Sequence, residues 1–249
     1  MPEPLKSLKW YKELADVKHR RHAGVFLAEG ERAIRQLLAQ DRSSLVEILA
    51  HGELPADFSS FPLRILTPGQ LKSISSSVTP HNIMAIFRLP EDSYSDNLPG
   101  NPGRHILLLE DIQDPGNIGT LIRTAAAFDY DGIILSDKCA DPFSPRCVQA
   151  SAGSVLSIWI RRTDRYLHLA GSLREQNFNI VAATLDGNID TSPLTSDRLL
   201  LALGNEGAGI SSDLLHIADY RFRLPVNPSK AESLNVAVCG GICMYLSTR

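Results

Sequence analysis

The sequence lacks the signals that mark several large classes of protein. No apolar run among its 249 residues approaches the ~20 residues that a membrane-spanning helix needs. The opening stretch M-P-E-P-L-K has no apolar segment like that of a secretion signal. The four cysteines show neither disulfide-like nor metal-like spacing, which is typical of reduced thiols. We therefore expect a cytoplasmic protein with no membrane segment and no metal.

A net positive charge is also missing. The chain has 25 Lys and Arg against 28 Asp and Glu, a formal net charge of −3. Any nucleic-acid surface must then be a local patch rather than a property of the whole molecule. No G-x-G-x-x-G follows the strand expected at 106–109, and G-x-x-x-x-G-K-[ST] occurs nowhere. Their absence argues against a dinucleotide-dependent enzyme and against a P-loop NTPase.

Short segments of strand and helix character alternate along the chain, which predicts an α/β fold. Residues 90–104 interrupt this alternation, because they are rich in Pro, Gly, Asn, Asp and Ser and have no periodicity. We expect a small α/β domain over 1–89, a linker over 90–104 and a larger α/β domain over 105–249. Continuous apolar runs in the larger domain are typical of strands buried on both faces, so its sheet should be mostly parallel, with helices on both sides.

The clearest candidate site lies in the loop and helix after the strand at 106–109. The turn-forming stretch D-P-G-N ends at Asn117, and a helix is expected over 118–128. In an open α/β sheet, ligands bind at the carboxyl ends of the strands, which is where Asn117 would lie. Arg123 follows within the helix. By itself this segment allows Arg123 to belong to the site or to be a surface arginine with a buried stem.

Two more polar loops follow later strands. The stretch G-N-E-G-A-G comes after the apolar run at 199–203, and its glycines would let the backbone pass close to a ligand. Glu206 would add a carboxylate there, although a simple turn with a solvated Glu is the alternative. The last loop leads into a helix that we expect to begin near Ser233, a good N-cap residue. Capping by Ser233 does not account for Asn235, which is a poor helix former.

The N-terminal segment is locally basic, with Trp10 and Tyr11 interleaved among Lys and Arg. This pattern fits a surface that contacts RNA phosphates and stacks a base. A solvated helix face with an aromatic residue in the core explains it equally well. The candidate RNA-binding residues are Lys9, Lys12, Lys18, Arg20 and Arg21.

The three loops together resemble a known family. D-P-G-N-I-G-T-L-I-R-T-A, G-N-E-G-A-G-I-S and S-L-N-V-A, in this order, are similar to motifs 1, 2 and 3 of the SpoU/TrmH family. These are RNA ribose 2′-O-methyltransferases of the SPOUT class. The N-terminal part, with F-L-A-E-G-E-R-A-I, resembles the family's L30e-like substrate-binding domain. The resemblance implies a SPOUT α/β domain with a deep trefoil knot, S-adenosyl-L-methionine (AdoMet) as cofactor, rRNA or tRNA as substrate, and a homodimer.

The resemblance also implies roles for individual residues. Carried over position by position, the catalytic candidates are Asn117, Arg123, Glu206, Ser233 and Asn235. The cofactor-binding candidates are Gly204, Leu224 and Leu234, with Thr184 at a strand end as a further one. Since a guanidinium stays protonated, we expect Arg123 to be an electrostatic clamp rather than a base. Pro228 departs from the family pattern, which usually has glycine near that place in a loop one residue shorter.

The last expected helix, V-A-V-C-G-G-I-C-M-Y-L, is apolar nearly all round, so it should be buried or at an interface. Gly240 and Gly241 each cost about 1 kcal/mol in a helix, which suggests that another backbone packs there, across a dimer. Cys239 and Cys243 are interpreted as apolar packing residues rather than metal ligands.

Two other functions remain open from the sequence. One is a non-catalytic RNA-binding protein that keeps the methyltransferase fold, and measurable AdoMet affinity would separate it from the enzyme. The other is a small-molecule nucleotide enzyme on a Rossmann-like sheet, which predicts NAD binding and no affinity for RNA.

Overall fold

The computed structural model describes residues 6–58, 60–77, 79–227 and 229–248. Pro228, where the sequence departs from the family pattern, lies outside the described residues. The chain divides into two compact units. The first comprises the described residues up to Glu91 together with Asp141–Ser157, and the second comprises Asp92–Ala140 and the described residues from Ile158 onward. Thus residues 92–104 belong to the second unit, and the segment at 141–157 packs with the first.

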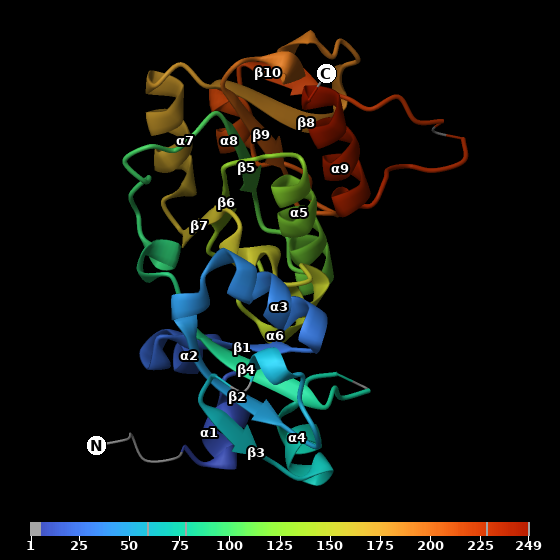
Figure 1. The fold of residues 1–249 in the computed structure, drawn as a ribbon. Helices are drawn as coiled ribbons and strands as arrows, with labels where there is room; N and C mark the ends of the chain where they lie inside the picture. The colour runs from blue at the N-terminus through green and yellow to red at the C-terminus, as the bar shows by residue number, and fades with distance from the viewer. Residues whose placement is uncertain (1–5, 59, 78, 228, 249) are drawn as a thin grey trace. The chain divides into compact units, whose positions relative to one another are not determined.

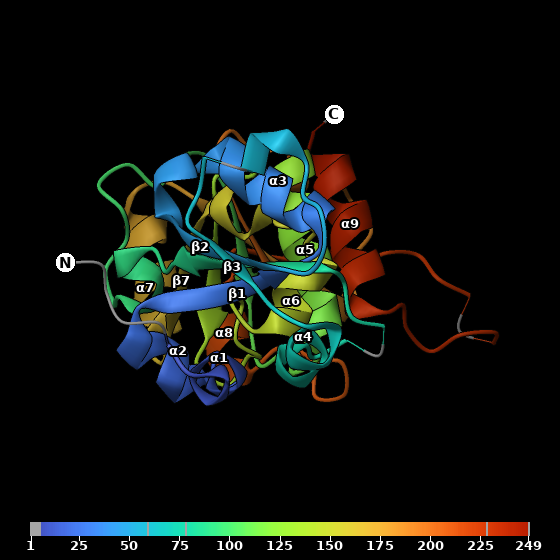
Figure 2. The same ribbon diagram turned by 60° about the horizontal axis from the view of Figure 1, so that its bottom comes forward.

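The first unit is built on a four-stranded sheet with the order β1-β4-β2-β3. Strand β4 pairs antiparallel with both β1 and β2, and β3 pairs parallel with β2. Helices α1 and α4 pack on one face of the sheet, and α3 and α6 contact the other (Figure 2). The strands are β1 (Val25–Glu29), β2 (Leu45–Ala50), β3 (Leu63–Ile65) and β4 (Ile83–Arg88). The helices are α1 (Leu8–Glu13), α2 (Val17–Ala23), α3 (Glu31–Gln40), α4 (Pro68–Ile74) and α6 (Pro145–Ala150).

The segment at 141–157 is held in the first unit by aromatic and ionic contacts. The ring centroid of Phe143 lies 5.3 Å from that of Phe26 in β1. The Phe26 ring in turn stacks on Phe87 in β4, with 5.7 Å between the centroids. Arg20 of α2 forms a buried ion pair with Asp141 at 2.8 Å. These contacts join segments far apart in sequence, which explains why a reading of local patterns assigned 141–157 to the C-terminal part.

The second unit contains a six-stranded, fully parallel sheet with the order β10-β8-β9-β5-β6-β7 (Figure 1). This confirms the predicted α/β fold with a mostly parallel sheet. The inner strands β9 and β6 are buried along their whole length, as their continuous apolar runs predicted. The strands are β5 (His105–Leu109), β6 (Gly132–Ser136), β7 (Trp159–Thr163), β8 (Asn179–Asn188), β9 (Leu199–Leu203) and β10 (Tyr220–Phe222).

Helices cover this sheet on both sides. Helices α5 (Pro115–Ala127) and α9 (Val236–Ser247) pack against each other, while α7 (Tyr166–Glu175) and α8 (Ser212–Ile217) form a second pair (Figure 1). Helix α5 begins at Pro115, earlier than expected, because Asp114 caps it by accepting a hydrogen bond from the Asn117 N–H. Short 3-10 turns occur at η1 (Arg42–Ser44), η2 (Ala56–Phe58), η3 (Glu91–Tyr94), η4 (Ser154–Leu156) and η5 (Ser192–Thr195). Among the described helices, none has the length and apolar character needed to cross a membrane.

The close packing expected at Gly240 occurs within the chain. A Cβ atom at this position would lie 2.5 Å from Cδ2 of Leu121 and 2.6 Å from Cδ1 of Leu203. Gly240 therefore lets α9 approach α5 and β9. The prediction that a backbone from a second subunit packs against Gly240 is wrong, because side chains of the same chain fill that space.

Candidate functional site

The three loops meet at the carboxyl ends of the central strands of the second unit. Asn117 Nδ2 donates a hydrogen bond to Glu206 Oε1 at 2.8 Å. Asn235 Nδ2 donates to Asn117 Oδ1 at 3.0 Å. The side chain of Asn117 thus connects the loop after β5 with the loop after β9 and with the start of α9. Three of the catalytic candidates form one hydrogen-bonded chain.

Asn235 also starts the C-terminal helix. Its Oδ1 accepts hydrogen bonds from the backbone N–H groups of Ala237 and Val238 at 2.9 and 3.3 Å, which makes it the N-cap of α9. The prediction that the helix begins near Ser233 is wrong, since Ser233 lies two residues before the cap and is exposed. Capping explains why Asn235 is tolerated here: it precedes the helix rather than interrupting it.

The glycine-rich loop is shaped by Asn205, which the sequence reading had not singled out. Its backbone pairs with Gly209 through two hydrogen bonds of 3.0 and 2.9 Å. Its Oδ1 accepts from the N–H groups of Gly207 and Ala208, and its Nδ2 donates to the Asp111 carbonyl. Asn in a tight turn after a buried strand was the available signal.

Gly204 is required by the same turn. A Cβ atom there would lie 2.3 Å from the Gly209 carbonyl oxygen, a distance that no side chain can adopt without moving the backbone. Gly204 and Asn205 together fix where the loop and Glu206 lie.

A second support of this loop is the buried carboxylate of Glu110, directly after β5. It accepts hydrogen bonds from Tyr166 Oη at 2.6 Å, from Ser211 Oγ at 2.6 Å and from the Ser211 N–H at 2.7 Å. Burial, with the hydrogen bond to Glu110 as a second cause, raises the pKa of Tyr166 well above its ordinary value, so its hydroxyl remains a donor. Ser211 ends the glycine-rich loop and caps α8, and Glu110 therefore anchors the exit of that loop. The sequence showed Glu110 only as one more acid after a strand.

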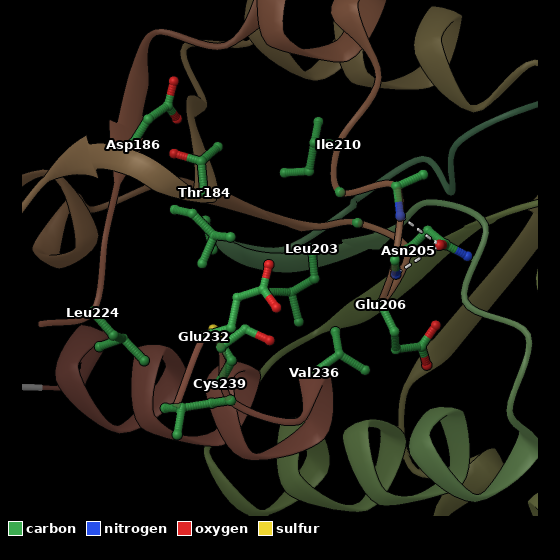
Figure 3. Close-up of a pocket in the computed structure, with 18 of the residues that line it drawn as sticks. Thr184, Asp186, Leu203, Asn205, Glu206, Ile210, Leu224, Glu232, Val236 and Cys239 are labelled. Atoms are coloured by element: carbon green, nitrogen blue, oxygen red, sulfur yellow. Dashed lines mark hydrogen bonds between the residues drawn. The ribbon is translucent and has the colours of Figure 1, made fainter. Parts of the chain in front are cut away.

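A cavity of about 510 Å³ opens beside the hydrogen-bonded chain (Figure 3). Its walls come from the second half of β8, the glycine-rich loop, the loop after β10 and the start of α9. Thr184 thus lies within β8 (Asn179–Asn188) and not at its end, where the sequence suggested it would lie. All four cofactor-binding candidates line it, as do two of the catalytic ones. These residues are Thr184, Gly204, Leu224, Leu234, Glu206 and Ser233.

Arg123 is not among the residues that line the cavity. It is exposed on α5, and among the described residues no hydrogen bond or ion pair connects it to Asn117, Glu206 or Asn235. At about 100° per residue, it lies roughly 240° around the helix from Asn117. The structure therefore brings together three of the five catalytic candidates directly and places Ser233 at the cavity, with Arg123 apart.

The basic N-terminal residues divide into two groups. Lys9, Lys12 and Lys18 are exposed, and Lys9 lies 3.7 Å from Glu13. Arg21 is exposed as well. Arg20 is only 1% exposed; its Nη1 donates to the carbonyls of Leu14 and Ala15, and its Nη2 to Asp141. The prediction that Arg20 contacts RNA is therefore wrong, because its guanidinium is a buried structural group.

Of the two interleaved aromatic residues, Tyr11 belongs to the core. It is 1% exposed, and its hydroxyl donates to Glu47 at 2.6 Å. Burial, followed by this hydrogen bond, raises the pKa of Tyr11 to about 12. Trp10 is half-buried and packs edge-on against Tyr11 and His19. The alternative of an aromatic residue in the core is thus the right one for Tyr11.

A model of the SpoU rRNA Methylase family matches residues 104–245, which include all three loops and the cavity. The chain belongs to the SpoU rRNA Methylase family. It is 30% identical over 242 residues to the 23S rRNA (guanosine(2553)-2′-O)-methyltransferase RlmP of Bacillus subtilis, covering 96% of this chain and 94% of the relative. The family resemblance stated from the sequence is thereby confirmed.

Solved structures of SpoU proteins extend the likeness over both units. An AdoMet-bound rRNA methyltransferase from Sinorhizobium meliloti has a TM-score of 0.78 at 28% identity, covering 96% of this chain and 93% of that one. AviRb from Streptomyces viridochromogenes has a TM-score of 0.86 and shares the fold at 24% identity, covering 99% and 98%. In the described part of the chain, no group of three or more His, Cys, Asp or Glu has the arrangement of a metal site.

Proposed function

We propose that this protein transfers a methyl group from AdoMet to a ribose 2′-hydroxyl of structured RNA, either rRNA or tRNA. The observation that carries the proposal is the hydrogen-bonded chain of Glu206, Asn117 and Asn235 beside the cavity. Family membership makes the protein a methyltransferase with AdoMet as cofactor, in agreement with the enzyme class and cofactor expected from the sequence. The relative from Bacillus subtilis makes rRNA the first substrate to test.

The cavity has the chemistry that AdoMet requires. Thr184 Oγ1 is shielded from solvent and has no hydrogen-bond partner among the described residues, so it is available to a ligand. The glycine-rich loop presents backbone groups, and Leu203, Leu224 and Val236 provide apolar walls for an adenine ring. When bound, the cofactor supplies an electrophilic methyl group on a positively charged sulfur.

The residues of this chain would act mainly by positioning. Asn117 and Asn235 hold each other and Glu206 in one arrangement, which presents a rigid edge to the ribose. Correct placement of two reactants can contribute ~7–11 kcal/mol to catalysis. The Ser233 hydroxyl, at the cavity, is a further group that would orient the ribose. We propose that Arg123 binds the adjacent phosphate and stabilises the negative charge that develops on the 2′-oxygen.

We also propose that the first unit binds the RNA, through the exposed Lys9, Lys12, Lys18 and Arg21. The side chain of Lys9 is 82% exposed and forms only a surface ion pair, so it can exchange Glu13 for phosphate at little cost.

A homodimer is proposed from the outer face of α9. Val238, Ile242 and Tyr245 are 51%, 38% and 43% exposed and follow each other at helical spacing, which forms an apolar stripe. A monomer in light scattering at micromolar concentrations would contradict this proposal. A deep trefoil knot in the second unit and a cytoplasmic location are also proposed, on the family resemblance.

The non-catalytic alternative was based on the loop around Pro228. The connected Asn117, Glu206 and Asn235 favour the enzyme instead, since a protein that only binds RNA has no need to keep these groups joined beside a cofactor cavity.

The test is methyl transfer in vitro. Purified protein with methyl-labelled AdoMet should modify rRNA or tRNA taken from a deletion strain, and nucleoside mass spectrometry should detect a 2′-O-methylated nucleoside. Arg123→Ala should bind AdoMet with near-normal affinity by calorimetry while methyl transfer collapses, and Arg123→Lys should restore little, because Lys cannot form bidentate bonds. Full activity of Arg123→Ala would refute the role of Arg123. Absence of transfer to every RNA by the wild type would refute the proposed function.

A further inference from the structure

The cavity proposed to bind AdoMet has acidic but no basic side chains. Three carboxylates line it: Asp186 from β8, Glu206 from the glycine-rich loop and Glu232 from the loop before α9. None of the lining residues within the described ranges is Lys, Arg or His. The cavity thus presents negative charge to any ligand that enters it.

The three carboxylates differ in how they are paired. Glu206 accepts a hydrogen bond from Asn117, and Asp186 lies 3.8 Å from Nη1 of Arg221. Glu232 forms no hydrogen bond or ion pair with any residue that the structure describes. Figure 3 shows Glu232 in the middle of the cavity, between Thr184 and Glu206. Among the three, only Asp186 has a cation beside it; Glu206 is held by a neutral amide, and Glu232 has neither a cation nor a hydrogen-bond donor among the described residues.

A negative cavity distinguishes the cofactor from its product. AdoMet and S-adenosylhomocysteine share the ammonium, the carboxylate and the adenosine, and they differ in the methyl group and in the positive charge on sulfur. Attraction between charges falls with distance and is strongest where no counter-ion competes. Glu232 is exposed to solvent where it lines the cavity, and a carboxylate there without an ion-pair partner favours the sulfonium over the neutral thioether, in the way that charge complementarity sets specificity at other binding sites.

We propose that Glu232 is a specificity-determining residue, which makes the cavity select the cationic cofactor over the neutral product and so promotes product release. The inference rests on the proposed function for the identity of the donor, and it is independent of which RNA is modified. Glu232 acts through its charge and takes no part in the methyl transfer itself.

Calorimetry on the full chain without RNA tests the proposal with three ligands. These are AdoMet, S-adenosylhomocysteine and sinefungin, in which an amine provides a positive charge near the place of the sulfonium. Glu232→Gln should weaken AdoMet and sinefungin about tenfold at low salt and leave S-adenosylhomocysteine within about twofold. Glu232→Asp should keep most of the discrimination. Glu175→Gln, exposed on α7, changes the net charge equally and should alter none of the three affinities.

Raising the salt concentration should reduce the discrimination of the wild type, since part of it is long-range attraction. Equal weakening of all three ligands by Glu232→Gln would overturn the proposal, because it would indicate a contact to a group that they share. Unchanged affinity for all three would overturn it as well. Failure of the wild type to bind AdoMet is a separate result, which would refute the proposed function together with this inference.

Discussion

Asn235 donates a hydrogen bond to Asn117 across 118 positions of the sequence. The same carboxamide of Asn235 accepts hydrogen bonds from the N–H groups of Ala237 and Val238 in the first turn of α9. One side chain therefore both caps a helix and connects two loops of the site. Asn117 in turn donates a hydrogen bond to Glu206. This relationship makes the geometry of the site testable by single substitutions.

Replacing Asn117 by Asp should disconnect the site. The new carboxylate would face Glu206 Oε1 without a proton to donate, and two like charges at hydrogen-bond distance repel. We expect methyl transfer to fall by about a hundredfold and stability by about 1–3 kcal/mol. Turnover assays and denaturant unfolding measure the two effects.

The double variant Asn117→Asp with Glu206→Gln provides the control. The amide of Gln would donate to the new carboxylate, which still accepts from Asn235, so stability should recover most of the loss. A double variant no more stable than the single Asn117→Asp variant would contradict the pairing.

Gly204→Ala should weaken cofactor binding strongly, because its Cβ would lie 2.3 Å from the Gly209 carbonyl oxygen and displace the loop. Gly207→Ala is the matched control in the same loop, where the nearest atom to a Cβ is Asn205 Oδ1 at 3.6 Å. Calorimetry should show at least a tenfold loss of AdoMet affinity in the first variant and a small change in the second. Equal affinities in both would show that the turn tolerates a side chain.

Substitutions of the basic residues in the first unit should have two different effects, one on folding stability and one on RNA affinity. Arg20→Ala leaves Asp141 buried without its cation and should cost about 3–5 kcal/mol of folding stability.

Lys12→Ala with Lys18→Ala should leave the melting temperature unchanged. Filter binding should show weaker RNA affinity for that variant, and the salt dependence should fall by about one unit of slope per lost phosphate contact. Unaltered RNA affinity would exclude these lysines from the RNA surface.

Cys239 should react with alkylating reagents faster than an ordinary thiol near neutral pH. A hydrogen bond from Cys243 is the main cause that lowers the pKa of Cys239, with burial opposing it. A lower pKa means that a larger fraction of Cys239 is thiolate, the reactive form, at a given pH. The alkylation rate should therefore rise at a lower pH than for a free thiol.

Two measurements check this assignment. Cys243→Ala should move the pH profile of Cys239 upward, because the stabilising donor is lost. AdoMet should protect Cys239, which lines the cavity, whereas Cys139 and Cys147 are buried and should be unreactive in both states. Alkylation of Cys239 at the same rate with and without AdoMet would indicate that the cofactor does not bind in this cavity.

Patterns within short segments predicted much of the second unit. Continuous apolar runs identified β6 and β9 as buried strands, and turn residues after them identified the loops. The start of α9 was misplaced because Ser and Asn are almost equally good N-caps, so the sequence alone does not distinguish Ser233 from Asn235, which caps the helix and also contacts Asn117.

Contacts between distant segments set the limit of the prediction. Arg20 is followed by other basic residues and looks like them, but its partner Asp141 lies 121 positions later. Glu110 is another such case, since its donors come from Tyr166 and Ser211. No local spacing reveals such partners, and for that reason one predicted RNA contact was wrong and one support of the glycine-rich loop was missed.

The double use of Asn235 has a consequence for how the protein responds to heat. The first turn of a helix frays more readily than its middle, because its N–H groups depend on the cap. Here any opening of that turn also releases Asn117 and, through it, Glu206. On warming, methyl transfer should therefore be lost at temperatures where circular dichroism still shows an intact fold.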